Sequence, residues 1–326
     1  MSFDNERFQM YLRFVEERHN IWRLRQLGEP PLWTGDPILA SKKFTNVFRV
    51  LDPGSQFVFD LEHEDPATTL MRLFLYRHTG RTEAWRYLLT EFGEYPTVDT
   101  LDDVLESWKA YRGEFSLSVR GEENNPRAGR AGAIKRVSAK PIFTGAYLVF
   151  PQSQVPGTDK LESIIRLTQR LFGPEKLAEE FLQATDQKGR FAALRRHKGV
   201  ADFMSMQILT DWGYTRFGTN EENDFIVPGP GARRGIQAIT KAPNQVGFMR
   251  FAREELLAGD RCPTINLDDR GTVRYPSIMD VQNTFCEFSK YVRFVEAGKV
   301  SKPYIPAHPG PQATPVLPQH WTTTTR

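Results

Sequence analysis

The chain has 326 residues, of which 40% are hydrophobic and 12% aromatic, and its 43 Lys and Arg residues nearly balance its 40 Asp and Glu residues. This composition is typical of a soluble globular protein and excludes a chain that is disordered over most of its length. The sequence has no run of 18 apolar residues, and charged residues interrupt its N-terminal stretch, so we expect neither a membrane span nor a signal peptide. We therefore predict a cytoplasmic location, or a nuclear one in a eukaryote.

Charge and cysteine content narrow the chemistry further. The net charge of +3 does not by itself indicate nucleic-acid binding, because phosphate affinity depends on clustered Lys and Arg residues. Cys262 and Cys286 lack the spacing of a zinc site and are too few for a disulfide framework. We predict reduced thiols, no metal site and no cofactor.

The N-terminal part of the chain has mainly helical patterns. Apolar residues at helical spacing predict a long helix over residues 3–27 and a second over 37–51, with Asp36 as its N-cap and Pro37 in its first turn. Further helices are expected over 66–79, 82–91 and 98–111. Short strand signals occur only at 56–59 and 146–150, so the fold class predicted is mainly α.

Residues 113–142 differ from their surroundings, because six Lys and Arg residues lie there among Gly, Asn and Pro. This pattern predicts a basic loop. Two interpretations remain open, an exposed surface insertion and a loop that follows the backbone of a polyanion.

Helical patterns return in the second half, at 158–172, 174–184, 187–196, 201–211 and 277–297. Residues 224–235 form a Pro/Gly-rich loop. The segment 301–326 has six prolines, a Thr run and few large apolar residues, which is typical of a disordered tail. We predict one helical domain with two lobes over residues 1–300, followed by this tail.

The turn Lys198-Gly199-Val200 joins two of the predicted helices. A helix pair with a glycine in its turn resembles a helix-hairpin-helix, in which backbone N–H groups hold a phosphate. Ala201 stands where a second glycine is usual, and an ordinary helical turn gives the same pattern. Lys198 and Gly199 are therefore candidates for DNA-backbone contacts.

The loop that starts at Asp224 continues with three glycines, two prolines and two adjacent arginines in residues 228–235. Gly229 and Gly231 would let the backbone approach a ligand closely, and Arg233 and Arg234 suit an anion. The alternative is a connecting turn with solvated arginines. The string GxxxxGK[ST] occurs nowhere in the chain, so ATP binding by a P-loop is not supported.

Two sets of polar residues are expected to share a helix face. The first set, spaced i, i+3, i+7 and i+10, comprises Asp280, Asn283, Glu287 and Lys290. The second, spaced i, i+3 and i+6, comprises Asn46, Arg49 and Asp52. Either face is consistent with a pocket wall or with a solvated surface.

Several blocks of sequence resemble the alpha-glutamyl/putrescinyl thymine pyrophosphorylase family, whose helical module is also named for 5-hydroxymethyluracil DNA kinases. The blocks read PLWTGDPIL at 31–39, FTNVFRVLD at 44–52, FTGAY at 143–147, DFIVPGPGARRG at 224–235 and DVQNTFCEFSKY at 280–291. They extend in order over nearly the whole predicted domain. The resemblance implies a fold like that of the helix-hairpin-helix DNA glycosylases and a role in phage-type thymine hypermodification.

The resemblance also implies a reaction in which an amine, an amino acid or a polyamine, replaces pyrophosphate on an activated 5-hydroxymethyluracil in double-stranded DNA. The expected partners are this DNA, the amine donor and a 5-hydroxymethyluracil DNA kinase of the same pathway. Asp224 would be the base or a cation-stabilising carboxylate, and Arg233 and Arg234 would clamp the pyrophosphate. The polar face from Asp280 to Lys290 would position the target nucleobase or the amine. Asn46, Arg49 and Asp52 are secondary candidates for substrate binding.

One departure and three alternatives accompany this interpretation. Phe203 stands where bifunctional glycosylases carry a lysine, which argues against Schiff-base chemistry. A glycosylase would release a free base and leave an abasic site. A kinase would consume ATP, and because the chain has no P-loop string, a partner protein would supply the kinase domain. A DNA-binding module without catalysis would depend on phosphate-contacting residues alone.

Overall fold

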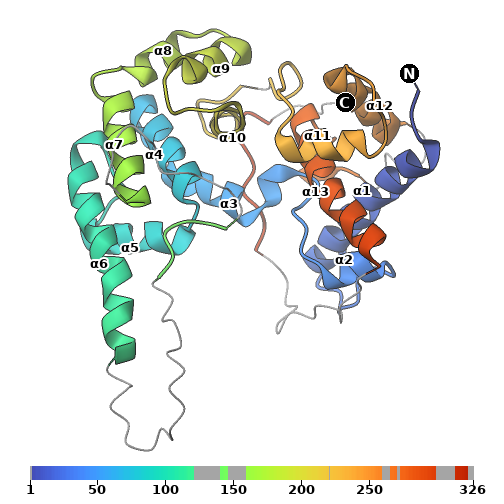
Figure 1. Cartoon of the computed structure of the whole chain (residues 1–326), viewed down its shortest axis with the longest axis horizontal. Coiled ribbons are helices and arrows are strands. Elements are labelled where there is room, and N and C mark those ends of the chain that lie inside the picture. Colours follow the sequence, from blue (N-terminus) through green and yellow to red (C-terminus); the bar gives the residue numbers. More distant parts are fainter. Residues whose placement is uncertain are drawn as a thin grey trace, which may run out of the picture. The chain divides into compact units, whose positions relative to one another are not determined.

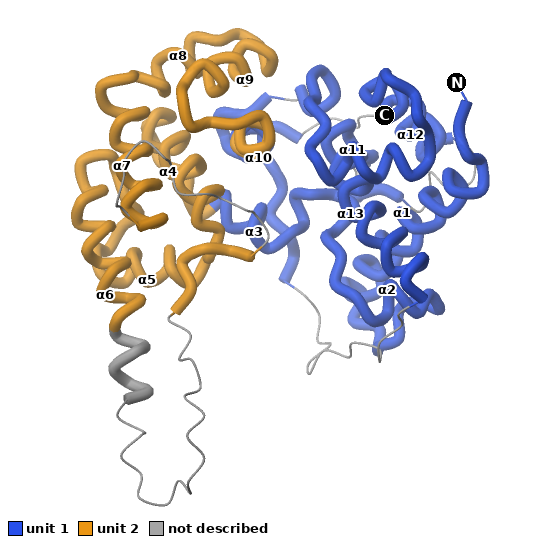
Figure 2. The backbone as a smooth tube through the Cα atoms, in the orientation of Figure 1, with its two compact units in different colours: residues 1–59, 209–326 blue, residues 60–208 orange. Residues whose placement is uncertain are grey.

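The computed structural model describes residues 2–120, 140–145, 159–219, 221–258, 265–269, 272–298 and 313–321. The chain divides into two compact units, coloured separately in Figure 2: unit 1 contains residues 1–59 and 209–326, and unit 2 contains residues 60–208. In the described ranges, no helix has both the length and the apolar character needed to cross a bilayer.

Unit 1 is built around one long helix near the C-terminal end of the chain (Figure 1). Its elements are α1 (Asn5–Gln26), α2 (Pro37–Ser41), the 3-10 helix η1 (Arg49–Leu51), α3 (Pro53–Gln56), α11 (Pro230–Gln237), α12 (Gln245–Leu257), β1 (Leu267–Asp269), β2 (Thr272–Arg274) and α13 (Ile278–Ala297). Strands β1 and β2 pair antiparallel, with Leu267 opposite Arg274. Helix α13 contacts α1, α2, α11 and α12, so it forms the centre of the unit.

Aromatic packing explains why α13 is central. Its Phe285 and Phe288 are fully buried, and the Phe285 ring stacks on Tyr11 of α1 with the ring centroids 4.2 Å apart. Phe248 of α12 adds a third ring, 6.0 Å from Phe285. Each buried aromatic ring removes a large apolar area from water, so this cluster contributes much of the stability of unit 1.

Helices α11 and α13 approach unusually closely because two glycines of α11 face α13. A Cβ atom added at Gly231 would lie 2.2 Å from the sulfur of Cys286, and one added at Gly235 would lie 2.0 Å from the carbonyl oxygen of Phe285. These glycines are therefore required by helix packing.

Unit 2 is helical and has its own core. Its elements are α4 (Pro66–Thr79), α5 (Thr82–Phe92), the 3-10 helix η3 (Val98–Thr100), α6 (Leu101–Arg120), α7 (Lys160–Phe172), α8 (Leu177–Gln183) and α9 (Gln187–Arg196). Helix α10 (Asp202–Trp212) begins in this unit and continues into residues of unit 1. The indoles of Trp85 and Trp108 are fully buried, with their centroids 5.9 Å apart.

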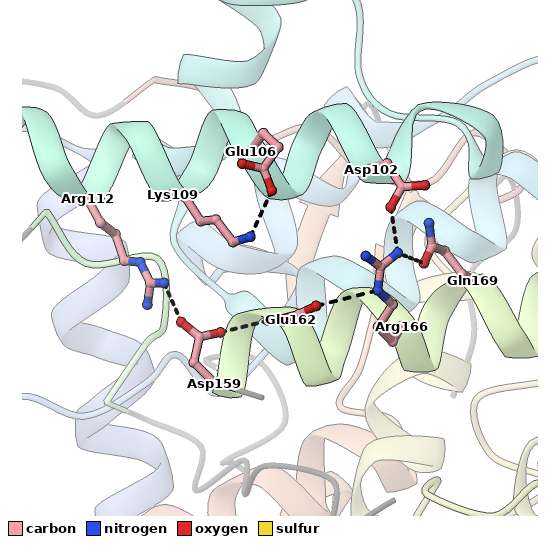
Figure 3. Close-up of polar contacts among 8 residues, drawn as sticks. All are labelled: Asp102, Glu106, Lys109, Arg112, Asp159, Glu162, Arg166 and Gln169. Carbon is pink, nitrogen blue, oxygen red and sulfur yellow. Dashed lines mark hydrogen bonds and ion pairs between the residues drawn. The ribbon is translucent and has the colours of Figure 1, made fainter. Parts of the chain in front are cut away.

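Two ion pairs join α6 to the N-terminal part of α7 in unit 2, and a third lies within α7 (Figure 3). Arg112 contacts Asp159 at 2.6 Å, and Arg166 contacts Asp102 at 2.5 Å and Glu162 at 3.8 Å. All five side chains keep a substantial exposed fraction, so each pair is worth less than ~1 kcal/mol. The apolar core between the helices is the main source of their association.

The structure confirms the mainly helical fold and most of the expected helices, and it corrects several predictions. The expected helix over 37–51 is broken, because α2 ends at Ser41 and only Arg49–Leu51 is helical again. The expected strand at 56–59 is helical. Residues 230–235 of the expected loop belong to α11, and α12 was not predicted.

Three other predictions fall partly or wholly outside the described residues. The strand at 146–150 and residues 121–139 of the basic loop lie outside them. Helix α6 includes residues 113–120, which the sequence assigned to that loop. In the segment predicted to be a disordered tail, residues 313–321 are described and contact unit 1, as Val316 exchanges two hydrogen bonds with Gln56.

Candidate functional site

Unit 1 contains a set of buried charged side chains, which we name the buried charge cluster. Its members, from α1, η1, the residue after η1, α10 and α13, are Arg18, Arg49, Asp52, Asp211, Asp280 and Glu287. All but the half-buried Asp52 are less than a tenth exposed. Burying charge is costly unless each group is paired or hydrogen-bonded, so such a cluster marks a functional-site candidate.

The polar face of α13 holds the segment between α2 and η1. Asp280 accepts a hydrogen bond from the backbone N–H of Arg49 at 2.8 Å, and Glu287 accepts one from the N–H of Thr45 at 3.2 Å. The amide of Asn283 donates to the carbonyl oxygen of Asn46 at 3.0 Å. The face predicted from sequence spacing therefore lies against protein backbone, with Asp280 and Glu287 buried and Asn283 and Lys290 partly exposed.

Asn46, Arg49 and Asp52 do not share a helix face as predicted, yet the fold brings them together. The backbone N–H of Asn46 donates to Asp52 at 2.8 Å, and its side-chain oxygen accepts from Arg18 at 2.7 Å. Arg18 also donates to the carbonyl oxygen of Phe44. These bonds replace helical ones, which explains why residues 42–48 are not helical.

Arg49 reaches into the centre of the unit. Its guanidinium lies 3.4 Å from the carboxylate of Asp211, which is fully buried on α10. Asp211 was not predicted as a site residue, because nothing in the spacing of α10 distinguishes it from a residue on a solvated turn.

Burial shifts the ionisation of the cluster. It raises the pKa of Asp52 to about 6, against hydrogen bonding from Asn46 and the positive charges of Arg18 and Arg49. Burial also raises the pKa of Asp280 and lowers that of Arg18 to about 10. A carboxylate with a pKa near neutrality can both accept and release a proton at physiological pH, which is what a general base requires.

A second buried pair, Glu222 and Arg274, lies beside the cluster. The guanidinium of Arg274 donates to Glu222 at 3.0 Å, and both residues are 7% exposed. Burial and the negative charge of Asp280 raise the pKa of Glu222 to about 8. Sequence reasoning selected the neighbouring Asp224 instead, since adjacent acidic residues are indistinguishable without the fold.

The raised pKa of Glu222 predicts a pH-dependent stability. Because the folded state holds its proton more tightly than the unfolded state, stability is fully present below about pH 4.5 and is lost as the pH rises towards 8. We expect Glu222→Gln to reduce the decline in the free energy of unfolding between pH 5 and pH 8 by ~1–3 kcal/mol, since each pKa unit is worth ~1.4 kcal/mol. Urea denaturation at several pH values measures this.

The control for this experiment is Glu296→Gln, which neutralises a carboxylate that is more than half exposed and ion-paired with Arg7. This variant should follow the wild-type pH dependence. Parallel curves for the wild type and Glu222→Gln would contradict the prediction.

The charged residues predicted from the loop at 224–235 lie at the surface, whereas its glycines are buried. Asp224, Arg233 and Arg234 are exposed, and Arg233 donates to the carbonyl oxygen of Pro228 at 2.8 Å. The N–H of Gly229 donates to the side chain of Gln282, and Gly231 packs on α13. The close approach expected of these glycines is therefore to α13 within the protein.

Exposed cations nevertheless lie near the outer end of α13. Burial and Glu287 raise the pKa of the Cys286 thiol, while the positive charges of Lys290, Arg234 and Arg293 oppose that rise. Lys290 also contacts the carboxylate of Glu287 at 2.5 Å. The cations therefore adjoin the cluster where it reaches solvent.

The turn between α9 and α10 lies in unit 2 and has the predicted helix-turn-helix form. Gly199 has a φ of +102°, a value that favours glycine. Arg170 and Arg195 donate to the carbonyl oxygens of Lys198 and Val200, while the side chain of Lys198 is exposed. The phosphate contacts assigned to Lys198 and Gly199 stay a prediction.

Comparison with known proteins identifies the family. The family model described as "5-hmdU DNA kinase, helical domain" matches residues 5–117 and 105–300. The chain belongs to this family. The match confirms the kinship with the helical module of 5-hydroxymethyluracil DNA kinases that the sequence blocks indicated.

One curated relative is a protein of Bacillus phage SP10 named 5-hmdU DNA kinase. It is 25% identical over an alignment of 265 residues, and this alignment covers 71% of this chain and 36% of the relative. The chain therefore spans about a third of the length of this kinase. No solved structure matches the chain.

Proposed function

We propose that the protein acts in the modification of 5-hydroxymethyluracil in DNA and that the buried charge cluster is its reactive site. The observation that supports this proposal is the cluster itself: charged groups of α1, η1, α10 and α13 converge in unit 1, and Asp52 combines partial exposure with a pKa near 6. Membership in the helical-domain family supplies the substrate class.

The reaction that this chemistry suits is displacement of pyrophosphate by an amine. The amine nitrogen bonds to the methylene carbon on C5 of the base, the bond from this carbon to oxygen breaks, and pyrophosphate leaves. The amine loses a proton, which Asp52 accepts. Lys290, Arg233 and Arg234 contact the leaving pyrophosphate, and Asn283 and Glu287 position the reacting groups.

This assignment gives Asp280 and Arg49 a positioning role. Both carboxylate oxygens of Asp280 are already hydrogen-bonded, one to Arg49 and one to Ser277. Asp224, the base predicted from sequence, is exposed and lies outside the cluster. A target base must leave the duplex to reach a buried site, and the turn at Lys198 and Gly199, like that of a helix-hairpin-helix glycosylase, would hold the DNA backbone.

We expect Asp52→Asn to lower the rate of amine transfer by ~100-fold or more, because the isosteric amide cannot accept the proton. In the wild type the rate should rise with pH through about 6, as the Asp52 carboxylate forms. Modified nucleosides released by digestion and counted by mass spectrometry measure both effects. The matched control variant is Asp224→Asn, which should keep the wild-type rate of amine transfer. If Asp224→Asn loses this rate and Asp52→Asn keeps it, Asp224 and not Asp52 is the general base.

The direct test of the reaction incubates the protein with duplex DNA that carries 5-pyrophosphoryloxymethyluracil and with a set of amino acids and polyamines. A new nucleoside with at least one donor supports the proposal. If no donor gives a new nucleoside, or if abasic sites form instead, amine transfer is wrong.

A second candidate function is that of a helical module serving a kinase, which the name and greater length of the phage SP10 relative favour. The phosphoryl transfer would then require a P-loop from another polypeptide segment, since the present sequence has no such string. Incubation of this chain with ATP and 5-hydroxymethyluracil DNA should leave the DNA unphosphorylated under either proposal. A 5-hmdU DNA kinase that lacks its helical domain is then added to this chain. If phosphorylation of the DNA is restored, the role as a kinase module is supported.

A further inference from the structure

Residues 313–321 cross the surface of unit 1 and are anchored at two points. The backbone of Val316 donates to the side chain of Gln56 at 2.8 Å and accepts from it at 3.0 Å. Trp321 is only 8% exposed, whereas Val316 is 53% exposed. The segment is therefore held by the two hydrogen bonds between Gln56 and Val316 and by its buried residues, Pro318 and Trp321.

The ring of Trp321 occupies a slot with a planar floor. The guanidinium carbon of Arg274 lies 3.6 Å from the centre of the indole, and Tyr214 meets the indole edge-on at a centroid distance of 6.2 Å and an angle of 82°. Glu222 fixes the guanidinium by its hydrogen bond. We name the space bounded by Arg274 and Tyr214 the indole slot.

The indole fits this slot incompletely. Its N–H group is buried and finds no hydrogen-bond acceptor within the described part of the chain. Leaving such a donor unsatisfied costs ~1–3 kcal/mol. Among residues 313–321, only Pro318 and Trp321 are buried, so the ring and this proline are the parts of the segment that pack most closely on unit 1. A planar group of similar size whose polar atoms find partners in the slot would therefore compete with Trp321.

We propose that the indole slot is a nucleobase-binding site and that Trp321 occupies it in place of a base flipped out of DNA. This inference rests on the proposed function, and it names how that site holds its substrate. Guanidinium planes of arginine and aromatic rings are the protein groups on which unstacked bases stack. A pyrimidine ring is smaller than an indole, so the slot leaves room for a substituent at C5.

The position of the slot supports this assignment. Arg49, Asp211 and Asp280 of the buried charge cluster all act electrostatically on Tyr214, one wall of the slot, and Glu222 beneath Arg274 interacts with Asp280. A base stacked on Arg274 would therefore lie beside the cluster that we propose to be reactive. The Trp321 side chain and a flipped nucleobase would then compete for the indole slot.

The first test is equilibrium binding of the full chain, measured by fluorescence anisotropy. The probe is a labelled duplex with one 5-hydroxymethyluracil opposite a mismatched base, which lowers the cost of flipping. We expect Trp321→Ala to bind this probe about tenfold more tightly, as expected if the ring closes the slot in about nine molecules of ten. Trp321→Phe, which retains a ring, should gain less.

Two variants control for indirect effects. Trp33→Ala removes another tryptophan of unit 1 that contacts an arginine, Arg25 at 5.2 Å, and should leave binding unchanged. Arg274→Lys in the Trp321→Ala background keeps a positive charge beside Glu222 but loses the stacking plane, and it should abolish the gain. Thermal unfolding of each variant verifies that it is folded.

The second test observes the ring directly. In the NMR spectrum of the wild type, the indole N–H resonance of Trp321, assigned with Trp321→Phe, should move to a solvent-exposed position on addition of the duplex. If the Trp321 resonance stays at its buried position at saturating DNA, or if Trp321→Ala binds the duplex no more tightly than the wild type, the nucleobase-binding role of the indole slot is wrong. The proposed reaction is unaffected by that result. If DNA displaces the Trp321 ring but no amine transfer is detected, the proposed reaction is wrong and the nucleobase-binding role of the indole slot is supported.

Discussion

Replacing Gly235 by alanine should lower the free energy of unfolding by at least ~2 kcal/mol, because the new methyl group would lie 2.0 Å from the carbonyl oxygen of Phe285. The clash is with the backbone of α13, so no side-chain rotation relieves it. The helices would have to separate, and the aromatic cluster around Phe285 would lose packing. Denaturant unfolding measures the loss.

Two further substitutions make this prediction specific. Gly231→Ala meets the flexible side chain of Cys286 and should cost less, and the added replacement Cys286→Ala should restore stability there but leave Gly235→Ala unchanged. Gly113→Ala, in an exposed and unobstructed turn of α6, should stabilise by ~1 kcal/mol. Equal effects at Gly113 and Gly235 would refute the close approach of α11 and α13.

The sequence predicts helices well where their ends carry local signals. Asp65 and Pro66 open α4, with the aspartate accepting from the N–H groups of Ala67 and Thr68, and Ser277 opens α13 with a capping box. These capping signals involve residues only two to three positions apart, so they can be recognised in the sequence without the fold. Helix α11 was missed because its glycines and prolines indicate a loop, and only the surface of α13 explains them.

The break after α2 shows why local patterns fail elsewhere. Phe44, Val47 and Phe48 have helical spacing, and all three are buried. The backbone around them is nevertheless bound by Arg18 and Glu287, which are distant in the sequence. Such long-range hydrogen bonds override local propensity, and no window along the chain contains them.

The candidate site divides in the same way. Asp280, Asn283 and Glu287 were predicted because one helix carries them at regular spacing. Asp211, Glu222 and Arg274 were not predicted, because their proximity depends on the packing of separate elements. A charged residue at a buried position is the signal that identifies them, and burial becomes visible only in the structure.

Substitution of Asp280 by alanine should be among the most damaging single changes in unit 1. Its carboxylate accepts from the N–H of Arg49 at 2.8 Å and from the N–H and hydroxyl of Ser277, each at 2.9 Å. All these donors are buried, and each one left unsatisfied costs ~1–3 kcal/mol. We therefore expect a loss of ~3–5 kcal/mol in the free energy of unfolding, measured by urea denaturation.

The comparison variant is Asp186→Ala, which removes the exposed N-cap of α9, where the carboxylate accepts from the N–H of Gly189 at 2.6 Å. Because water can replace an exposed cap, this loss should be ~1 kcal/mol. Asp280→Asn keeps one acceptor oxygen and should be intermediate. If Asp280→Ala instead costs no more than Asp186→Ala, the carboxylate does not hold the segment at Arg49 in place. Asp280 would then be free to take part in the chemistry directly, because its position would no longer be required for folding.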